Sequence, residues 1–282
     1  MAEKHAPAHK ISSRPGIGTT ARIVQSQPLR FSRVVVGDPM LIVVKYGRKE
    51  LHAPDFECVL EPGDAIAIGA RQAFDIVNTP GPDGQYQADW LVWDPALVMA
   101  FTPSDPAGAF IDIAIDLGRL TGEFARAIDS ALDAIRHPGH IPDAVARHRL
   151  VEVLVWIETC GGHFAHHRPE TTSGRVRHFV GASPDSMWSA PLVASKLGMS
   201  EATLRRRLAH EKTSLSDLIA DVRMSVAMQL LQSTDLPVSR IALDVGYGSA
   251  SRFAIRFRRR FGFAPSAIRG HKRPAAEIAN KR

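Results

Sequence analysis

Residues 245–265, VGYGSASRFAIRFRRRFGFAP, hold five arginines and four phenylalanines in one short segment. Phe253, Phe257 and Phe261 are spaced four apart, so they share one face of a helix. Four arginines fall on an adjoining face: Arg252, Arg256, Arg259 and Arg260. Guanidinium groups suit phosphates and the edges of guanine bases. The segment therefore predicts a helix that is buried on one side and presents positive charge on the other.

A second stretch, VASKLGMSEATLRRRL (193–208), repeats the pattern of IALDVGYGSASRFAIRF (241–257), which has one extra residue. In each, a short apolar helix is followed by Gly198 or Gly246, where a sharp turn needs a positive φ. Ser200 or Ser249 is then placed to cap the next helix. Both stretches therefore predict helix-turn-helix units. The helix expected between them, of about 20 residues, spans about 30 Å, close to one turn of DNA.

The charge of the chain is uneven. Residues 173–282 carry 19 Lys and Arg against 8 Asp and Glu, a net +11, whereas the remainder carries 16 against 21, a net −5. A basic segment of this kind suits a polyanion, with nucleic acid as the first candidate and a solvated surface as the alternative. The paired helix-turn-helix units favour nucleic acid.

Three stretches carry a resemblance to a known family: WSAPLVASKLGMS (188–200), RMSVAMQLL (223–231) and IALDVGYGSASRFAIRFRRRFGFAP (241–265). They resemble the DNA-binding domain of the AraC/XylS family of bacterial transcription regulators. The resemblance implies DNA contacts from Ser200, Ala202, Thr203, Arg205 and Arg206 in the first unit, and from Ser249, Ala250, Ser251, Arg252, Ile255 and Arg256 in the second. Ala202 and Ile255 are apolar where relatives often carry larger or polar residues, and either suits a thymine methyl group.

Short apolar runs between residues 22 and 116, separated by Gly, Pro, Asp and Asn, predict a β-barrel or β-sandwich. The segment EPGD (61–64) has the residues of a type II turn. This region resembles the cupin-type sensing and dimerisation barrel of the same family. Because a barrel interior can hold a small molecule, Tyr46, Phe74, Trp90 and Trp93 are candidate effector-lining residues, with ordinary core packing as the commoner role for each.

Helices are expected across residues 117–161, with apolar spacing at Phe124, Ile128, Leu132 and Ile135. Asp143 is a plausible cap and Gly161 a stop for the second of them. By resemblance these are dimerisation helices. The expected organisation is α+β: a disordered tail (1–21), a cupin-like barrel (22–116), dimerisation helices (117–161), a linker (162–172), a DNA-binding domain with two helix-turn-helix units (173–273) and a C-terminal tail (274–282).

The sequence favours a dimeric, cytoplasmic, sequence-specific regulator of transcription that binds double-stranded promoter DNA and is not an enzyme. The alternative is a metal-dependent cupin enzyme with an appended DNA-binding module. Such enzymes need about three His or Glu ligands, and His52 is the sole histidine of the predicted barrel. No cofactor, metal or membrane partner is expected. A non-specific nucleoid-type binder is a third reading. RNA polymerase and a small-molecule effector are possible further partners. The sequence does not distinguish an activator from a repressor.

Overall fold

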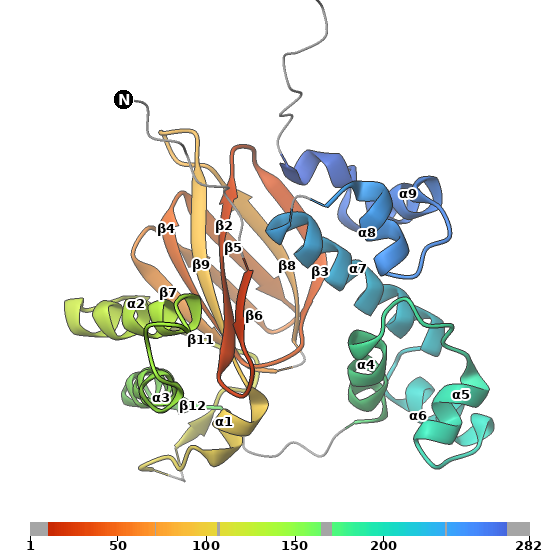
Figure 1. Ribbon diagram of the computed structural model, residues 1–282, viewed down its shortest axis with the longest axis horizontal. Helices are drawn as coiled ribbons and strands as arrows, with labels where there is room; N and C mark the ends of the chain where they lie inside the picture. The colour runs from red at the N-terminus through yellow and green to blue at the C-terminus, as the bar shows by residue number, and fades with distance from the viewer. Residues whose placement is uncertain (1–10, 71, 106–107, 165–170, 235, 270–282) are drawn as a thin grey trace, which may run out of the picture.

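The computed structural model describes residues 11–70, 72–105, 108–164, 171–234 and 236–269. An N-terminal β-domain packs between two groups of helices (Figure 1). Its longer strands are β1 (Ile11–Arg14), β2 (Gly18–Gln25), β3 (Leu29–Val36), β4 (Met40–Tyr46), β5 (Arg48–Ala53), β6 (Phe56–Leu60), β7 (Asp64–Ile68), β8 (Gln72–Thr79), β9 (Tyr86–Trp93) and β11 (Ala114–Arg119). The short strands β10 (Ala109–Phe110) and β12 (Gly162–His163) pair in parallel.

Two antiparallel sheets form the β-domain. One has the strand order β1-β2-β9-β4-β7-β11 and the other the order β3-β8-β5-β6. Side chains along each strand alternate between the two faces of a sheet. In β4, Ile42 and Val44 therefore join the core between the sheets, whereas Leu41 and Val43 join the core on the opposite face. The six-stranded sheet is buried on both faces, which accounts for the unbroken apolar run at its centre.

Three helices belong to the N-terminal part: α1 (Pro95–Ala100), α2 (Gly122–Arg136) and α3 (Asp143–Thr159). Phe124, Ile128 and Leu132 of α2 pack on the outer face of the six-stranded sheet, as their spacing predicts. The turn at EPGD is also confirmed, because Gly63 has φ of 95° and the Asp64 N–H donates to the Glu61 carbonyl at 3.0 Å. Asp143 does not cap α3. Pro142 occupies the cap position, and Asp143 instead accepts a hydrogen bond from Arg14 Nε at 2.9 Å.

The predicted N-terminal tail is wrong over residues 11–21, which form β1 and the start of β2. β2 pairs along its whole length with β9. Arg14 is buried and donates to the Ala134 carbonyl at the end of α2, at 2.7 Å. Long-range pairing therefore orders a polar segment that has no helical or alternating apolar pattern of its own. The tail predicted for residues 274–282 lies outside the described residues.

The C-terminal domain is helical. Its helices are α4 (Thr172–Ala182), α5 (Ala190–Lys196), α6 (Glu201–His210), α7 (Leu215–Ser233), α8 (Val238–Asp244) and α9 (Ala250–Phe261), followed by the 3₁₀ helix η1 (Pro265–Arg269). α7 runs diagonally, with α4 to α6 near one end and α8 and α9 near the other (Figure 1). The linker predicted for residues 162–172 includes β12 and the first residue of α4.

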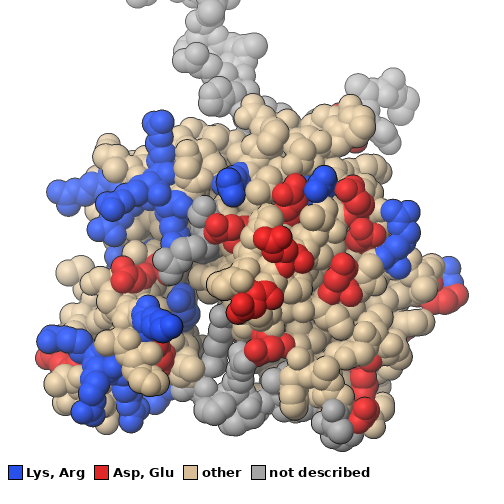
Figure 2. Space-filling model, turned by 180° about the vertical axis from the view of Figure 1, so that it is seen from behind, with Lys and Arg blue, Asp and Glu red and all other residues tan. Residues whose placement is uncertain are grey.

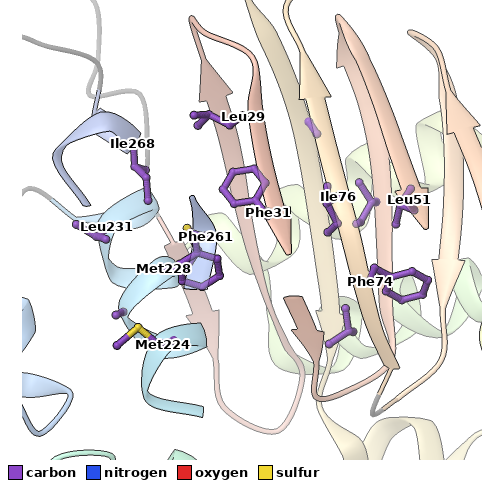
Figure 3. Close-up of a cluster of buried hydrophobic side chains, with 14 of the residues drawn as sticks. Leu29, Phe31, Leu51, Phe74, Ile76, Met224, Met228, Leu231, Phe261 and Ile268 are labelled. Carbon is purple, nitrogen blue, oxygen red and sulfur yellow. The ribbon is translucent and has the colours of Figure 1, made fainter. Parts of the chain in front are cut away.

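The β-domain and the C-terminal domain share one hydrophobic core. Leu29 and Phe31 of β3 belong to the same buried cluster as Met228 of α7 and Phe261 of α9 (Figure 3). The ring of Phe31 also meets the ring of Phe263 edge-on, with centroids 5.5 Å apart. Strand β3 therefore supports both α7 and α9, and β2 also contacts α7.

Candidate nucleic-acid interface

The first helix-turn-helix unit consists of α5 and α6. Gly198, in the turn between them, has φ of 65°, as the sequence predicts. Ser200 Oγ accepts the Thr203 N–H at 3.2 Å and so caps α6, which satisfies one of the free N–H groups at the helix start. Leu204 and Leu208 face inward and pack with Val193 of α5, which leaves the other side of α6 to solvent.

The second unit consists of α8 and α9. Gly246 has φ of 79°, and Ser249 Oγ accepts the Arg252 N–H at 3.3 Å. Gly262 ends α9 in the left-handed conformation, with φ of 85°. Three phenylalanines form the buried face of α9, with neighbouring centroids 5.5 and 4.6 Å apart: Phe253, Phe257 and Phe261. The local design that the sequence predicts is present in both units.

Most of the residues expected to contact DNA are accessible. The exposed ones are Ser200, Ala202, Arg205 and Arg206 on the first unit, and Ser251, Arg252, Ile255 and Arg256 on the second; Thr203, Ser249 and Ala250 are half-buried. Ile255 is 69% exposed, far more than an isoleucine that packs in a core. The face opposite the phenylalanine stripe therefore presents Ile255 between two arginines.

One arginine of the predicted basic face is turned the other way. Arg260 donates from Nη2 to Asp221 Oδ1 of α7 at 3.0 Å, and its side chain is 17% exposed. It is committed to an internal ion pair and is not part of the outer face. Arg258 and Arg259, by contrast, are exposed. The partner of Arg260 is about 40 residues away in sequence, so helix periodicity alone could not identify it.

Basic side chains gather over the C-terminal helices. Figure 2 shows two groups of Lys and Arg, an upper one over α8 and α9 and a lower one over α5 and α6, whereas Asp and Glu predominate over the β-domain. Both groups are visible from the same side of the molecule. The excess of positive charge in the C-terminal part is thus divided between the two units and shared by one face, which suits a polyanion.

Two charged residues of α7 connect the second unit to segments that lie beside the first, and sequence reasoning missed both. Asp221 is buried and reaches Arg260 of α9 and, at 4.0 Å, Arg177 of α4. Arg223 donates to the carbonyls of Pro184 and Ser186, at 2.8 and 2.9 Å, in the segment that leads into α5. The available signal was that Asp221 and Arg223 lie between apolar residues in the middle of α7.

Glu211, just beyond α6, was also missed. Its carboxylate accepts the backbone N–H groups of Thr172 and Ser173, at 2.9 and 2.8 Å, at the start of α4. Partial burial raises the pKa of Glu211, but the hydrogen bonds from Ser173 and Thr172 together outweigh it, so the pKa lies below the usual value. A carboxylate at a helix N-terminus also interacts favourably with the helix dipole.

The structure does not bring the four candidate effector-lining residues together. Phe74 and Trp90 belong to the core between the sheets, whereas Trp93 packs on the opposite face and donates from Nε1 to the Leu150 carbonyl at 3.1 Å. Tyr46 is 52% exposed and borders an open hollow beside α2. Trp90 and Trp93 are three positions apart on β9, and residues an odd number of positions apart in a strand face opposite sides of the sheet.

A buried polar cluster lies inside the β-domain instead. Lys49 of β5 donates to Asn78 Oδ1 at 3.0 Å, and Asn78 Nδ2 donates to Gln25 Oε1 at 3.1 Å. The Lys49 ammonium also lies 5.8 Å from the centre of the Tyr86 ring. Burial lowers the pKa of Lys49 to about 7. The Tyr86 hydroxyl and Gln25 Nε2 have no hydrogen-bond partner among the described residues, so the cluster has donors in excess.

Neither a metal centre nor a membrane segment is found in the part of the chain that the structure describes. No three His, Cys, Asp or Glu side chains there could hold a metal ion together, and no helix there is long and apolar enough to cross a bilayer. The nitrogens of His52 lie 3.6 and 3.5 Å from Glu50 and Glu57, on a partly exposed strand. Both glutamates lie beside His52 on one side of the four-stranded sheet, on β5 and β6.

Comparisons with known proteins agree with this geometry. Residues 193–271 match a family model described as a helix-turn-helix domain. The HTH-type transcriptional regulator YdeO of Escherichia coli K12 is 34% identical over 98 residues, which are 35% of this chain and 38% of YdeO. The regulator GadX of the same strain is 34% identical over 94 residues, 33% of this chain and 34% of GadX. The chain therefore matches only about a third of the length of these relatives.

Similarity of fold extends over nearly the whole chain. ToxT from Vibrio cholerae, solved with a bound unsaturated fatty acid, covers 90% of this chain and 95% of its own, with a TM-score of 0.69 and 11% identity. A second ToxT structure, bound to a naphthalenyl butenoic acid, has a TM-score of 0.68 and 13% identity over 90% of this chain. Residues 193–271 thus match a helix-turn-helix domain, and the β-domain together with the C-terminal helices has the fold of the ToxT structures.

Proposed function

We propose that this protein is a sequence-specific DNA-binding regulator of transcription that reads promoter DNA with both helix-turn-helix units. The observation that carries the proposal is the pair of capped recognition helices, α6 and α9, each with arginines exposed on its outer side. Arginines and the N–H groups of the helix starts would bind phosphates, and Arg205, Arg206, Arg252 and Arg256 would meet base edges. Binding to chromosomal DNA would place the protein in the cytoplasm.

Selection of bound sequences from random duplexes tests this function. A specific regulator should enrich a site with two separated blocks of preferred bases, one for each recognition helix. Competition with bulk genomic DNA should then leave binding to the selected site measurable. A nucleoid-type binder would enrich no site and would lose all binding to the competitor, because it responds to charge and deformability alone. That outcome would contradict the proposal.

Dimerisation is part of the proposal and is supported by helix α3. Val145 and Val155 are 41% and 42% exposed on α3. A second copy that packs here would cover both. The mass in solution, measured by light scattering, should fall from dimer to monomer for Val155→Glu. The control Val59→Glu, at an equally exposed valine of β6, should leave the dimer intact; equal behaviour of the two variants would argue against α3.

Control by a small molecule is also proposed, and the donor-rich cluster at Lys49 supports it. Buried donors in excess are matched by an acceptor such as a carboxylate, the group that the fatty acid bound to ToxT carries. Oleate should raise the melting temperature of the protein more than oleyl alcohol does, and Lys49→Met should abolish that difference. Lys45→Met, at a lysine paired with Asp129 near the surface, should retain it. Loss of the difference in both variants, or in neither, would exclude this site.

An enzymatic role is not proposed. The relatives named above are transcriptional regulators, and the neighbours of His52 are two glutamates on a partly exposed strand pair. Contact with RNA polymerase would follow from action at promoters, and a pull-down with purified polymerase on the selected site tests it. Retention of polymerase by the DNA-bound protein is expected for an activator, whereas exclusion is expected for a repressor.

A further inference from the structure

Helix α7 carries two charged residues that each contact the second helix-turn-helix unit and a segment that lies beside the first. The first is Asp221, whose two carboxylate oxygens point to different helices. Oδ1 lies 3.0 Å from Arg260 Nη2 on α9, and Oδ2 lies 4.0 Å from Arg177 Nη2 on α4. Asp221 is 8% exposed, so water screens these charges only weakly. One carboxylate therefore ties the recognition helix of the second unit to the helix that supports the first.

The second residue is Arg223, two positions further along α7. Its Nε and Nη2 hold the carbonyls of Pro184 and Ser186, which lead into the first unit. Its guanidinium carbon lies 6.0 Å from the centre of the Tyr247 ring, in the turn of the second unit. Residues two apart do not share a helix face, so Asp221 and Arg223 act from different sides of α7.

Gly246 shows how closely the second unit approaches Arg223 and the segment that leads into the first unit. A Cβ atom added at Gly246 would lie 2.6 Å from Arg223 Nη2 and 2.8 Å from the Pro184 carbonyl oxygen. The turn of the second unit is thus in contact with both the guanidinium and the segment that enters the first unit. Two contacts on different sides of one helix restrict both separation and rotation of the units.

We propose that Asp221 and Arg223 are positioning residues that set the distance and rotation between α6 and α9, and thereby the spacing of the two base blocks that the protein selects. The inference rests on the proposed DNA binding. Each base pair inserted between two blocks moves them apart by about 3.4 Å and rotates one relative to the other by about 34°. A rigid pair of units must therefore discriminate sharply between spacings, whereas a loosely held pair adapts to several.

The first test uses the full chain and the site selected by the wild-type protein. Duplexes with one or two base pairs inserted or deleted between the blocks are compared with the parent duplex. The wild type should lose about tenfold in affinity for one inserted pair, the cost of a poor contact. For Asp221→Asn and Arg223→Met the loss should shrink to about twofold. Asp244→Asn, which removes an ion pair confined to α8, is the matched control and should keep the wild-type ratio.

The second test needs no DNA. Spin labels at Ala202→Cys and Ser251→Cys, in a Cys160→Ser background, report the distance between the recognition helices. Cys58 is buried and should stay unlabelled. The contacts of Asp221 and Arg223 are called the clamp below. The wild-type protein, with the clamp intact, should give one narrow distribution of the distance between the two labels. Asp221→Asn and Arg223→Met should broaden that distribution, and Asp244→Asn should not. If thermal melting shows that Asp221→Asn is unfolded, Arg177→Gln and Arg260→Gln, which each remove one of its two ion-pair partners, replace it.

The two tests separate this inference from the proposed function. A wild-type protein that selects no site refutes the function, and the spin-label distances then still decide whether the clamp exists. A selected site with wild-type spacing ratios in the folded variants overturns the inference while the function stands. A distribution of spin-label distances that stays narrow in the folded variants also overturns the inference. Broad distances together with relaxed spacing support it.

Discussion

The two helix-turn-helix units share a local design and differ in what holds them. The first unit packs with α4 and α7 in a cluster whose buried members are aliphatic, among them Leu204 and Leu208. The second unit uses phenylalanines, and its core is continuous with that of the β-domain through Phe31 and Leu29. The β-domain therefore contacts α9 directly, whereas α7 lies between the β-domain and α6.

The largest expected effect is on the continuous core. Phe257→Ala should lower the free energy of unfolding by about 3–5 kcal/mol, because it leaves a cavity among three other phenylalanine rings. Hydrogen exchange should then rise in α9 and also in β3. Leu208→Ala should lower the free energy of unfolding by about 2–5 kcal/mol. It should raise hydrogen exchange in the first unit and leave exchange in β3 unchanged. Equal hydrogen exchange of β3 in the two variants would contradict the difference between the two cores.

The two turn glycines give the next largest contrast. Both have positive φ, so alanine at either position should cost about 1–2 kcal/mol of strain. Around Gly198 a Cβ would meet open space, whereas at Gly246 it would clash with Arg223 and Pro184. Overpacking adds about 1–3 kcal/mol, so Gly246→Ala should cost about 2–5 kcal/mol in all. Urea denaturation measures both, and a smaller loss for Gly246→Ala than for Gly198→Ala would contradict the proposed close approach.

DNA binding compares the exposed faces of the two recognition helices, α6 and α9. Arg252→Ala or Arg256→Ala should weaken binding to the selected site by about 1–3 kcal/mol where the side chain pairs with guanine. Preference should relax in one base block, and Arg206→Ala should relax it in the other. Arg240→Ala, on α8, should alter neither block. Unchanged affinity and footprint for Arg252→Ala and Arg256→Ala together would remove α9 from the interface.

The helix caps should behave alike in the two units. Ser200→Ala and Ser249→Ala each remove one hydrogen bond to a helix start, and each should cost about 1 kcal/mol in thermal or urea unfolding. Glycine at either position should recover most of the loss, since it suits a cap position. A cap whose removal has no effect would show that its helix is held by tertiary packing alone.

The smallest effect distinguishes the units by pH. Hydrogen bonds from Ser173 and Thr172 lower the pKa of Glu211 below the usual carboxyl value of about 4.3. The ionised carboxylate thus stabilises the folded first unit above pH 4.3, and this contribution is lost as the pH falls through the lowered pKa. In Glu211→Gln the stability of this region should fall less steeply as the pH is lowered. Hydrogen exchange at α4, measured as a function of pH, checks this. A parallel acid limb in the variant would exclude Glu211.

Local signals in the sequence predicted both units because they act over a few residues. The glycine turns at 198 and 246, the caps at Ser200 and Ser249, and the phenylalanine spacing of α9 all appear where the pattern places them. The α2 and α3 helices likewise follow from apolar periodicity. These features need only backbone conformation and one helix face, which neighbouring residues determine.

Tertiary structure alone decided which distant groups meet. It turned Arg260 inward to Asp221, recruited residues 11–21 as strands, and divided Trp90 and Trp93 between opposite faces of one sheet. It also placed Phe31 against Phe263, which joins the β-domain to the second unit. Such contacts depend on strand register and on the packing of segments far apart in the chain, and short-range spacing carries no information about either.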